Sequence, residues 1–209
     1  MRGNVRPMRA LCLALALVLP LPSLADRLIF IPTATKLNYG SYRLEHVFDQ
    51  RGGANSQTYL GLGVGLAFDM AVTSGDIQGG DDVSVDFAFH VLDPIVNLAP
   101  GFSVGVVDAM DRTADGRRLY IATTYRSGLD GPFNAFTPAE VTLGVFMGSR
   151  NAMFVGVQLP FSDALRVLVE HDSNRLAAGL EVRPFKAMSL RWVQREDRQV
   201  WSLGYRGRL

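Results

Sequence analysis

The chain has 209 residues, of which 48% are hydrophobic, and its 21 basic and 20 acidic side chains give a formal net charge of +1. A charge this close to zero, with no basic patch, argues against a nucleic-acid partner. The single cysteine, Cys12, lies in a segment with the features of a signal peptide. We therefore expect a mature chain without disulfides, thiol catalysis or cysteine-ligated zinc.

The first 25 residues have the three parts of a secretory signal peptide. Arg2, Arg6 and Arg9 form a basic region, residues 11–21 are apolar, and Ser23-Leu24-Ala25 is a small-residue cleavage site. The apolar run is shorter than the ~20 residues that a helix needs to span a bilayer, which argues against an uncleaved anchor. Removal of the signal leaves 18 basic and 20 acidic residues, a formal charge of −2.

The mature chain, residues 26–209, is a succession of alternating segments without a linker or a second domain. In each segment large apolar side chains occupy every second position, which is the pattern of a strand with one apolar face. About eleven strands are indicated, and because bacterial single-chain barrels have an even number of strands we expect ten or twelve. In chain order the segments are 42–48, 59–73, 83–91, 102–106, 119–125, 141–147, 153–159, 165–169, 176–182, 188–192 and 201–209, and 28–31 offers one more.

Residues 59–73 form the longest alternating segment. Every second residue from Leu60 to Val72 is large and apolar, and Gly, Ala and Asp69 lie between them. Ordinary strands have about 5–6 residues, whereas a tilted strand that crosses a bilayer needs roughly 9–11 with this pattern. We therefore expect an all-β fold, an antiparallel up-and-down transmembrane β-barrel of about 10–12 strands. Its expected location is the outer membrane of a Gram-negative-type bacterium, with outer-membrane lipid and the barrel assembly machinery as partners.

The second face of these segments favours a membrane barrel over a soluble one. It consists mostly of Gly, Ala, Ser and Thr with scattered charges, and the chain has only two lysines. A narrow barrel needs small and charge-paired side chains inside. Aromatic residues near strand ends match interfacial girdles, namely Tyr42, Tyr59, Tyr125, Phe185, Trp192 and Trp201. The alternative is a soluble periplasmic β-barrel that binds a small apolar ligand.

Ionisable side chains on the second face are the candidate lumen-lining residues. Glu170 and Arg183 lie on neighbouring segments, and we expect them to pair. Either a selective polar channel or a salt-bridged plug would explain the set, because an unpaired buried charge costs several kcal/mol. The glycines of segment 59–73 would make room for either. The lumen-lining candidates are Asp69, Asp86, His90, Glu140, Arg166, Glu170, Glu181, Arg183 and Arg191.

His171 and Ser173 are the candidate catalytic pair, because side chains two apart on a strand share a face and an imidazole can activate a hydroxyl. The His-Asp-Ser-Asn run resembles an element of outer-membrane lipid A deacylases, which would require Glu181 or Glu196 as the acid. A lipid-modifying enzyme is therefore the second functional hypothesis. The competing interpretation is a tight polar turn, for which Asp-Ser-Asn is suited. The three histidines lie on separate segments without metal-ligand spacing, so neither a metal nor a cofactor is expected.

Two stretches resemble YjbH-like outer-membrane proteins. Residues 28–35 followed by 40–44 are similar to the opening of those proteins, where a strand leads into a Pro-Thr-Ala element and then a glycine. Residues 169–172 with 178–184 resemble their repeated unit. The resemblance covers about a quarter of a chain that is much shorter than typical members, and it carries over no catalytic residue. It implies a β-barrel linked to exopolysaccharide production.

Together these observations predict a non-enzymatic outer-membrane barrel. Its expected role is that of a small channel, or of an accessory protein in envelope or exopolysaccharide biogenesis or export. Polysaccharide and export-system proteins are then the candidate partners.

Overall fold

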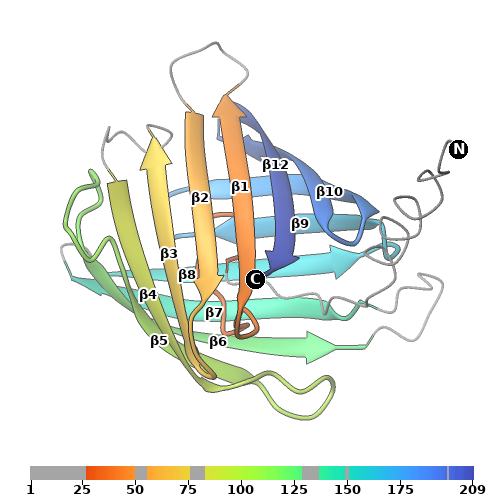
Figure 1. The fold of residues 1–209 in the computed structure, drawn as a ribbon, viewed down its shortest axis with the longest axis horizontal. Coiled ribbons are helices and arrows are strands. Elements are labelled where there is room, and N and C mark those ends of the chain that lie inside the picture. The colour runs from red at the N-terminus through yellow and green to blue at the C-terminus, as the bar shows by residue number, and fades with distance from the viewer. Residues whose placement is uncertain (1–26, 50–55, 76–82, 129–136, 149–150, 197) are drawn as a thin grey trace, which may run out of the picture.

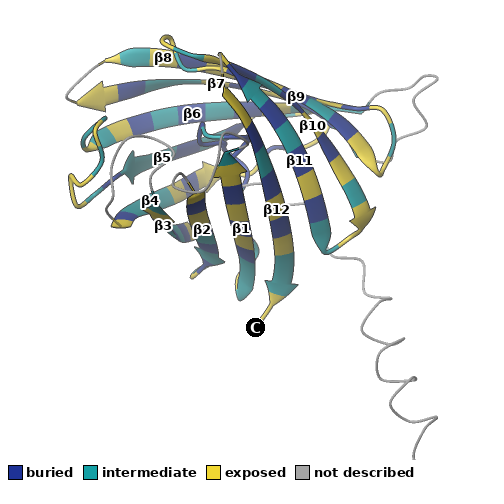
Figure 2. Ribbon diagram, turned by 90° about the horizontal axis from the view of Figure 1, so that it is seen from above, coloured by how far each residue is buried: buried dark blue, intermediate teal, exposed yellow. Residues whose placement is uncertain are grey.

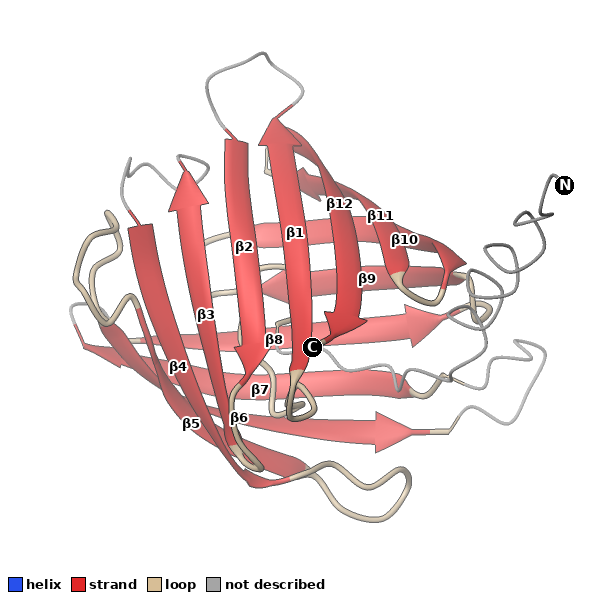
Figure 3. Cartoon of the chain, viewed as in Figure 1, coloured by secondary structure: helices blue, strands red, loops and turns tan. Residues whose placement is uncertain are grey.

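The computed structural model describes residues 27–49, 56–75, 83–128, 137–148, 151–196 and 198–209. Their regular structure is entirely strand (Figure 3), and no helix among them is long and apolar enough to cross a membrane. The expected signal peptide, residues 1–25, lies outside the described residues.

Twelve strands form a closed antiparallel barrel (Figure 1). Each strand pairs with its neighbours in the sequence, and the first strand pairs with the last to close the ring. This confirms the all-β, up-and-down barrel and the upper of the two expected strand numbers. The strands are β1 (Ser41–Asp49), β2 (Ser56–Gly63), β3 (Phe68–Gly75), β4 (Val83–Leu92), β5 (Gly101–Val107), β6 (Arg118–Ser127), β7 (Ala139–Gly148), β8 (Ala152–Pro160), β9 (Leu165–His171), β10 (Leu176–Phe185), β11 (Met188–Arg195) and β12 (Arg198–Arg208).

The prediction of a single strand over residues 59–73 is wrong, because this segment forms a hairpin of two strands. β2 ends at Gly63, and the turn 64–67 closes when the N–H groups of Val64 and Gly65 donate to the carbonyl of Phe68 (3.1 and 3.2 Å). Gly63 pairs with Asp69, so the alternation runs through the turn in phase, and large apolar residues of both strands face outward. The twelfth strand comes from this division.

The segment expected to supply an extra strand, residues 28–31, instead lies inside the barrel. Residues 27–37, here called the plug, enter the lumen before β1 begins (Figure 1). A bridge between Arg27 and Pro32 and a hydrogen bond from Leu28 N–H to the Ile31 carbonyl (3.0 Å) fold the first part into a tight loop. Leu28, Ile29 and Ile31 are 2–4% exposed. They pack against Val47, Tyr120, Ala122, Phe146, Phe154, Leu168, Ala177, Val193 and Val200 of the barrel wall.

Buried and exposed residues alternate along the strands (Figure 2). The outer positions carry large apolar side chains, among them Leu119, Leu143 and Leu203, as the lipid-facing wall of a transmembrane barrel requires. Of the aromatic residues expected at the rims, Tyr125 and Phe185 are exposed, and Tyr42, Trp192 and Trp201 are half-buried at outward-facing strand positions.

Tyr59 is the exception among those aromatic residues. It shares the inward face of β2 with Gln57 and is 3% exposed. The guanidinium carbon of Arg27 lies 3.7 Å from the centre of its ring. A cation held against an aromatic face stabilises both groups in the interior, so Tyr59 is part of the support of the plug.

Candidate functional site

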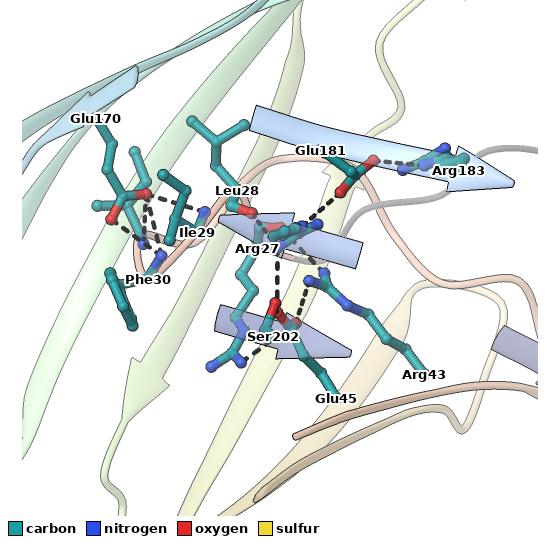
Figure 4. Close-up of polar contacts among 12 residues, drawn as sticks. Arg27, Leu28, Ile29, Phe30, Arg43, Glu45, Glu170, Glu181, Arg183 and Ser202 are labelled. Atoms are coloured by element: carbon teal, nitrogen blue, oxygen red, sulfur yellow. Dashed lines mark hydrogen bonds and ion pairs between the residues drawn. The ribbon is translucent and has the colours of Figure 1, made fainter. Parts of the chain in front are cut away.

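Two buried carboxylates gather the arginines at the centre of the lumen (Figure 4). The first is Glu45 on β1, which accepts hydrogen bonds from Arg43 Nη2 (2.5 Å) and Ser202 Oγ (2.8 Å). Arg27 Nη2 and Arg191 Nη1 each lie 3.4 Å from one of its oxygens. Glu45 therefore ties the plug, through Arg27, to three strands of the wall.

The second carboxylate is Glu181 on β10, which is 0% exposed. Its two oxygens pair with the Nε atoms of Arg183 and Arg191, and Arg166 Nη1 lies 3.8 Å away. Arg191 also donates to the Leu28 carbonyl of the plug (2.9 Å). Arg191 thus connects Glu181, Glu45 and the plug, and in this network each charge has an opposite charge nearby, as burial demands.

Glu170 on β9 holds the tip of the plug. Its carboxylate accepts N–H groups from Ile29 (3.0 Å), Phe30 (3.0 Å) and Ile31 (3.3 Å) (Figure 4). Consecutive N–H groups that converge in a tight turn form a concave anion site. The expected pair of Glu170 with Arg183 is therefore wrong. Glu170 lies opposite Ala177 on β10, and Arg183 lies six residues farther on, about 20 Å along a strand.

Asp69 on β3 holds the other end of the plug. One of its oxygens accepts the N–H of Leu37 (2.8 Å) and also contacts His90 Nε2 (3.0 Å). Between the two ends, Ala34 N–H donates to Thr124 Oγ1 (2.9 Å), and Arg126 contacts Glu140 (2.9 Å). Glu170 lies near the end of β9 and Asp69 near the start of β3, so the plug is fastened at two depths of the barrel.

Removal of the charge on Glu170 is expected to loosen the plug tip. In Glu170→Gln, amide exchange of residues 29–31 should accelerate by roughly tenfold or more, since a hydrogen bond to a charged group contributes about 1.5–3 kcal/mol. Hydrogen–deuterium exchange with mass spectrometry measures it, and peptides from β12 serve as the internal reference. Unchanged exchange at the plug tip would show that Glu170 does not hold it.

The wall has a glycine where the plug tip passes. A Cβ atom on Gly156 would come within 2.5 Å of Leu28 Cδ2 and 2.6 Å of Ile31 Cδ1. Gly156→Val is expected to displace the plug, because overpacking costs about 1–3 kcal/mol. Trypsin cleavage after Arg27 or Lys36 reports the displacement. Gly65→Ala, whose Cβ would meet only ordinary contacts, is the control and should remain as resistant as the wild type.

All nine lumen-lining candidates are at interior-facing positions. Asp69, His90, Glu140, Arg166, Glu170, Glu181 and Arg191 are buried, and Asp86 and Arg183 are half-buried. Arg43 and Glu45 also face inward and were not among the candidates, although their alternation with Tyr42, Leu44 and His46 indicates the inward face. The plug residue Arg27 and the strand residues Arg195 and Arg206 are further interior residues that were not predicted.

Arginines outnumber carboxylates inside the described part of the barrel. The interior-facing arginines of plug and strands are Arg27, Arg43, Arg118, Arg126, Arg166, Arg183, Arg191, Arg195 and Arg206, and the carboxylates are Glu45, Asp49, Asp69, Asp86, Glu140, Glu170 and Glu181. Among these arginines, Arg118 and Arg166 at Nε and Arg206 at Nη2 retain a buried nitrogen without a partner among the described residues.

Asp108 follows β5 at the barrel end that carries the β1–β2, β3–β4 and β5–β6 connections, here called the loop end. Its N–H donates to Asp86 (2.8 Å), and its carboxylate accepts from Arg112 N–H (3.0 Å) and from the N–H and hydroxyl of Thr113 (2.6 and 2.8 Å). Burial acts to raise the pKa of Asp108, but these donors outweigh it and hold the pKa below its usual value. The charged form therefore orders this end of the lumen.

The candidate catalytic residues do not assemble. Ser173 donates its hydroxyl to the Met153 carbonyl (2.5 Å), and only its backbone N–H reaches His171 Nδ1 (3.2 Å). Glu181 faces the lumen, whereas His171 is exposed. Asp172 accepts the N–H groups of the two residues that follow Ser173 (3.1 and 2.7 Å), so this run is a polar turn. Glu196, the other proposed acid, lies in the turn between β11 and β12.

Comparison with known proteins identifies the fold. No protein-family model and no curated protein matches the chain. Among solved structures it is similar to the KdgM porin, with a TM-score of 0.51 and 10% identity over 81% of this chain and 99% of that one. The KdgM porin in complex with disordered oligogalacturonate gives 0.51 at 8% identity, again over 81% and 99%.

A third similar structure is the outer membrane protein Omp33 of Acinetobacter baumannii. It matches with a TM-score of 0.51 and 9% identity over 81% of this chain and 98% of that one. Together with the closed ring of twelve strands, these likenesses confirm the transmembrane β-barrel fold.

Proposed function

We propose that the protein is a non-enzymatic outer-membrane channel for small acidic solutes, which the plug keeps closed. The observation that carries the proposal is an interior in which arginines outnumber carboxylates, with the plug seated among them. The fold shared with outer-membrane porins supports the membrane and the channel class. The dispersal of His171, Ser173 and Glu181 over two faces removes the support for lipid deacylation.

The lumen suits anions for a physical reason. Guanidinium groups stay charged at any physiological pH and bind carboxylates with paired donors. A channel with low-dielectric walls focuses the field of one charge sign and concentrates solutes of the opposite sign. The partner-free nitrogens of Arg166 and Arg206 would add donors along the path of such a solute.

An acidic glycan is the solute class that we favour. One of the similar structures is a KdgM porin in complex with oligogalacturonate, an acidic sugar chain. The resemblance of residues 28–35 to YjbH-like proteins adds a link to exopolysaccharide production. We therefore propose a role in the passage or export of acidic saccharides, with export-system proteins as partners.

The membrane part of the proposal is tested by heat-modifiable gel mobility of the protein extracted from the outer-membrane fraction. A mobility shift between unheated and boiled samples is expected of a folded membrane barrel, and its absence would contradict that location.

The channel part is tested by reversal potentials in planar bilayers. The experiment uses a KCl gradient and the barrel without residues 27–37, so that the lumen is open. Current carried mainly by chloride is expected, and Arg166→Gln with Arg206→Gln should shift the potential toward zero. If the barrel without residues 27–37, with both arginines in place, conducts cations in preference to chloride, the proposed solute class is contradicted. Arg198→Gln, at an exposed position, is the matched control.

A further inference from the structure

A separate cavity lies between the plug and the wall formed by β2 to β6. Its volume is about 100 Å³. The plug borders it with Arg27, Phe30 and Pro32. The wall lines it with residues near the loop end, such as Gln57 and Arg118, and the lining extends along β3 to Asp69. The cavity is thus placed where a solute that enters from the loop end meets the plug.

Two residues that line this cavity each hold a buried polar atom without a partner among the described residues. Gln57, which is 5% exposed, has an unpaired Oε1, and Arg118 has an unpaired Nε. A buried donor or acceptor left unpaired costs about 1–3 kcal/mol. One lining residue thus has an unmatched acceptor and another has an unmatched donor, which are the groups that a polar molecule would pair with.

The lining has the mixed character that a sugar ring requires. Phe30 and Val107 supply apolar surface, and Thr73 and Ser84 supply hydroxyls. A sugar has apolar C–H faces and a rim of groups that both donate and accept hydrogen bonds. An inorganic anion would leave the apolar surface unused. The cavity volume of about 100 Å³ exceeds the roughly 10–15 Å³ that a single water needs, so the space admits more than one water.

The charged side chains of the lining are two arginines, Arg27 and Arg118, and two aspartates, Asp69 and Asp86. Arg27 and Arg118 are both held against aromatic rings, with Arg118 Cζ 4.4 Å from the centre of the Phe146 ring, so their guanidinium groups are already positioned. Each arginine also has a carboxylate nearby, since Arg27 Nη2 lies 3.4 Å from Glu45 and Arg118 Nη2 lies 3.6 Å from Asp115. The carboxylates of the lining accept hydrogen bonds from neighbouring groups. Asp86 accepts Ser84 Oγ (3.1 Å) and Asp108 N–H (2.8 Å), and Asp69 accepts Leu37 N–H.

We propose that this cavity binds a single hexuronate residue, with its carboxylate at Arg118 and Arg27 and its hydroxyls at Gln57 and Ser84. The inference rests on the proposed solute class. It adds a specific binding site to the proposed channel. The residue is either a free acidic monosaccharide or the end of an acidic chain, since both present the same ring and carboxylate.

Calorimetric titration of the folded, detergent-solubilised protein tests the site. The probes are galacturonate, its linear trimer and neutral galactose. Galacturonate is expected to bind at least about tenfold more tightly than galactose, the effect of about 1.4 kcal/mol from one charge-assisted contact. A trimer that binds as well as the monomer indicates a chain end. A trimer that binds while the monomer does not would contradict a single-residue cavity.

Variants assign the residues. Arg118→Gln should weaken galacturonate binding at least about tenfold and leave galactose unchanged, and Gln57→Leu should weaken both probes. Arg198→Gln, at an exposed position, should change neither. Heat-modifiable mobility confirms that each variant is folded. Equal affinity for galacturonate and galactose, or unchanged affinity in both lining variants, would overturn the proposal.

The outcome is independent of the channel test. Chloride-selective current without galacturonate binding would remove the site and keep the channel. Galacturonate binding in a cation-selective barrel would keep the site and remove the proposed solute path.

Discussion

Deletion of residues 27–37 is expected to raise the conductance of the barrel at least about tenfold, because a ring of this size encloses an open lumen only when nothing fills it. The plug side chains Leu28, Ile29 and Ile31 occupy the centre of the lumen in the described structure. The wall closes without them, since β1 pairs directly with β12 over nine residue pairs. The deletion should therefore open the barrel and leave the ring of strands intact.

Planar-bilayer recording of the intact and shortened proteins measures the change. Heat-modifiable mobility shows that both are folded. If the shortened barrel is as silent as the intact one, the plug is not the barrier to current.

A reversible disulfide between the plug and the wall distinguishes displacement of the plug from a general loosening of the barrel. Gly156 faces Leu28 closely, so Leu28→Cys with Gly156→Cys is expected to form a disulfide that fixes the plug. The described residues contain no other cysteine, which keeps the background clear. In an otherwise plug-loosened Glu170→Gln barrel, the disulfide should suppress current until a reductant is added. A current that is the same before and after addition of the reductant would contradict gating by the plug.

The alternation of apolar residues predicted the barrel well because side-chain parity is a local property. The same parity indicated the interior positions of Asp69, Glu140 and Arg191, since a strand residue needs no knowledge of its neighbours to face inward. The boundaries of most strands followed from turn residues. This part of the fold is therefore determined by short local segments of the sequence.

The hairpin at 64–67 escaped prediction because nothing in it breaks the alternation. Gly63 pairs with Asp69, and an even separation keeps outward residues in phase on both sides of the turn. The turn also contains no Asn-Gly or Asp-Gly pair, the strongest short-range hairpin signal. One long strand and a hairpin of two short strands therefore give the same alternation of apolar residues in the sequence.

The plug escaped prediction for a different reason. Residues 28–31 are a short apolar run, which periodicity alone cannot assign. Their place is set by partners far along the chain, such as Glu170 and Arg191. The expected pair of Glu170 with Arg183 failed for the same cause, because strand register and not strand order decides which charges meet.

Glu181→Gln is expected to be the most destabilising single substitution in the lumen, with a loss of about 3–5 kcal/mol in the free energy of unfolding. Glu181 is fully buried, and it neutralises Arg183 and Arg191 directly and Arg166 at 3.8 Å. Glutamine keeps the shape and removes the charge, so the arginines remain buried without their counter-ion. Urea unfolding in detergent, followed by tryptophan fluorescence, measures the loss.

Two further variants separate charge from packing. Glu196→Gln lies at an exposed turn position and should shift the unfolding midpoint little, since exposed charges contribute at most about 1 kcal/mol. The double variant Glu181→Gln with Arg183→Gln should recover part of the loss, because it removes one of the uncompensated cations, and the coupling energy follows from the cycle of four proteins. A loss in Glu181→Gln no larger than in Glu196→Gln would mean that solvent, and not Glu181, balances the arginines. The lumen would then be hydrated, and the network of ion pairs would not be what holds the plug in place.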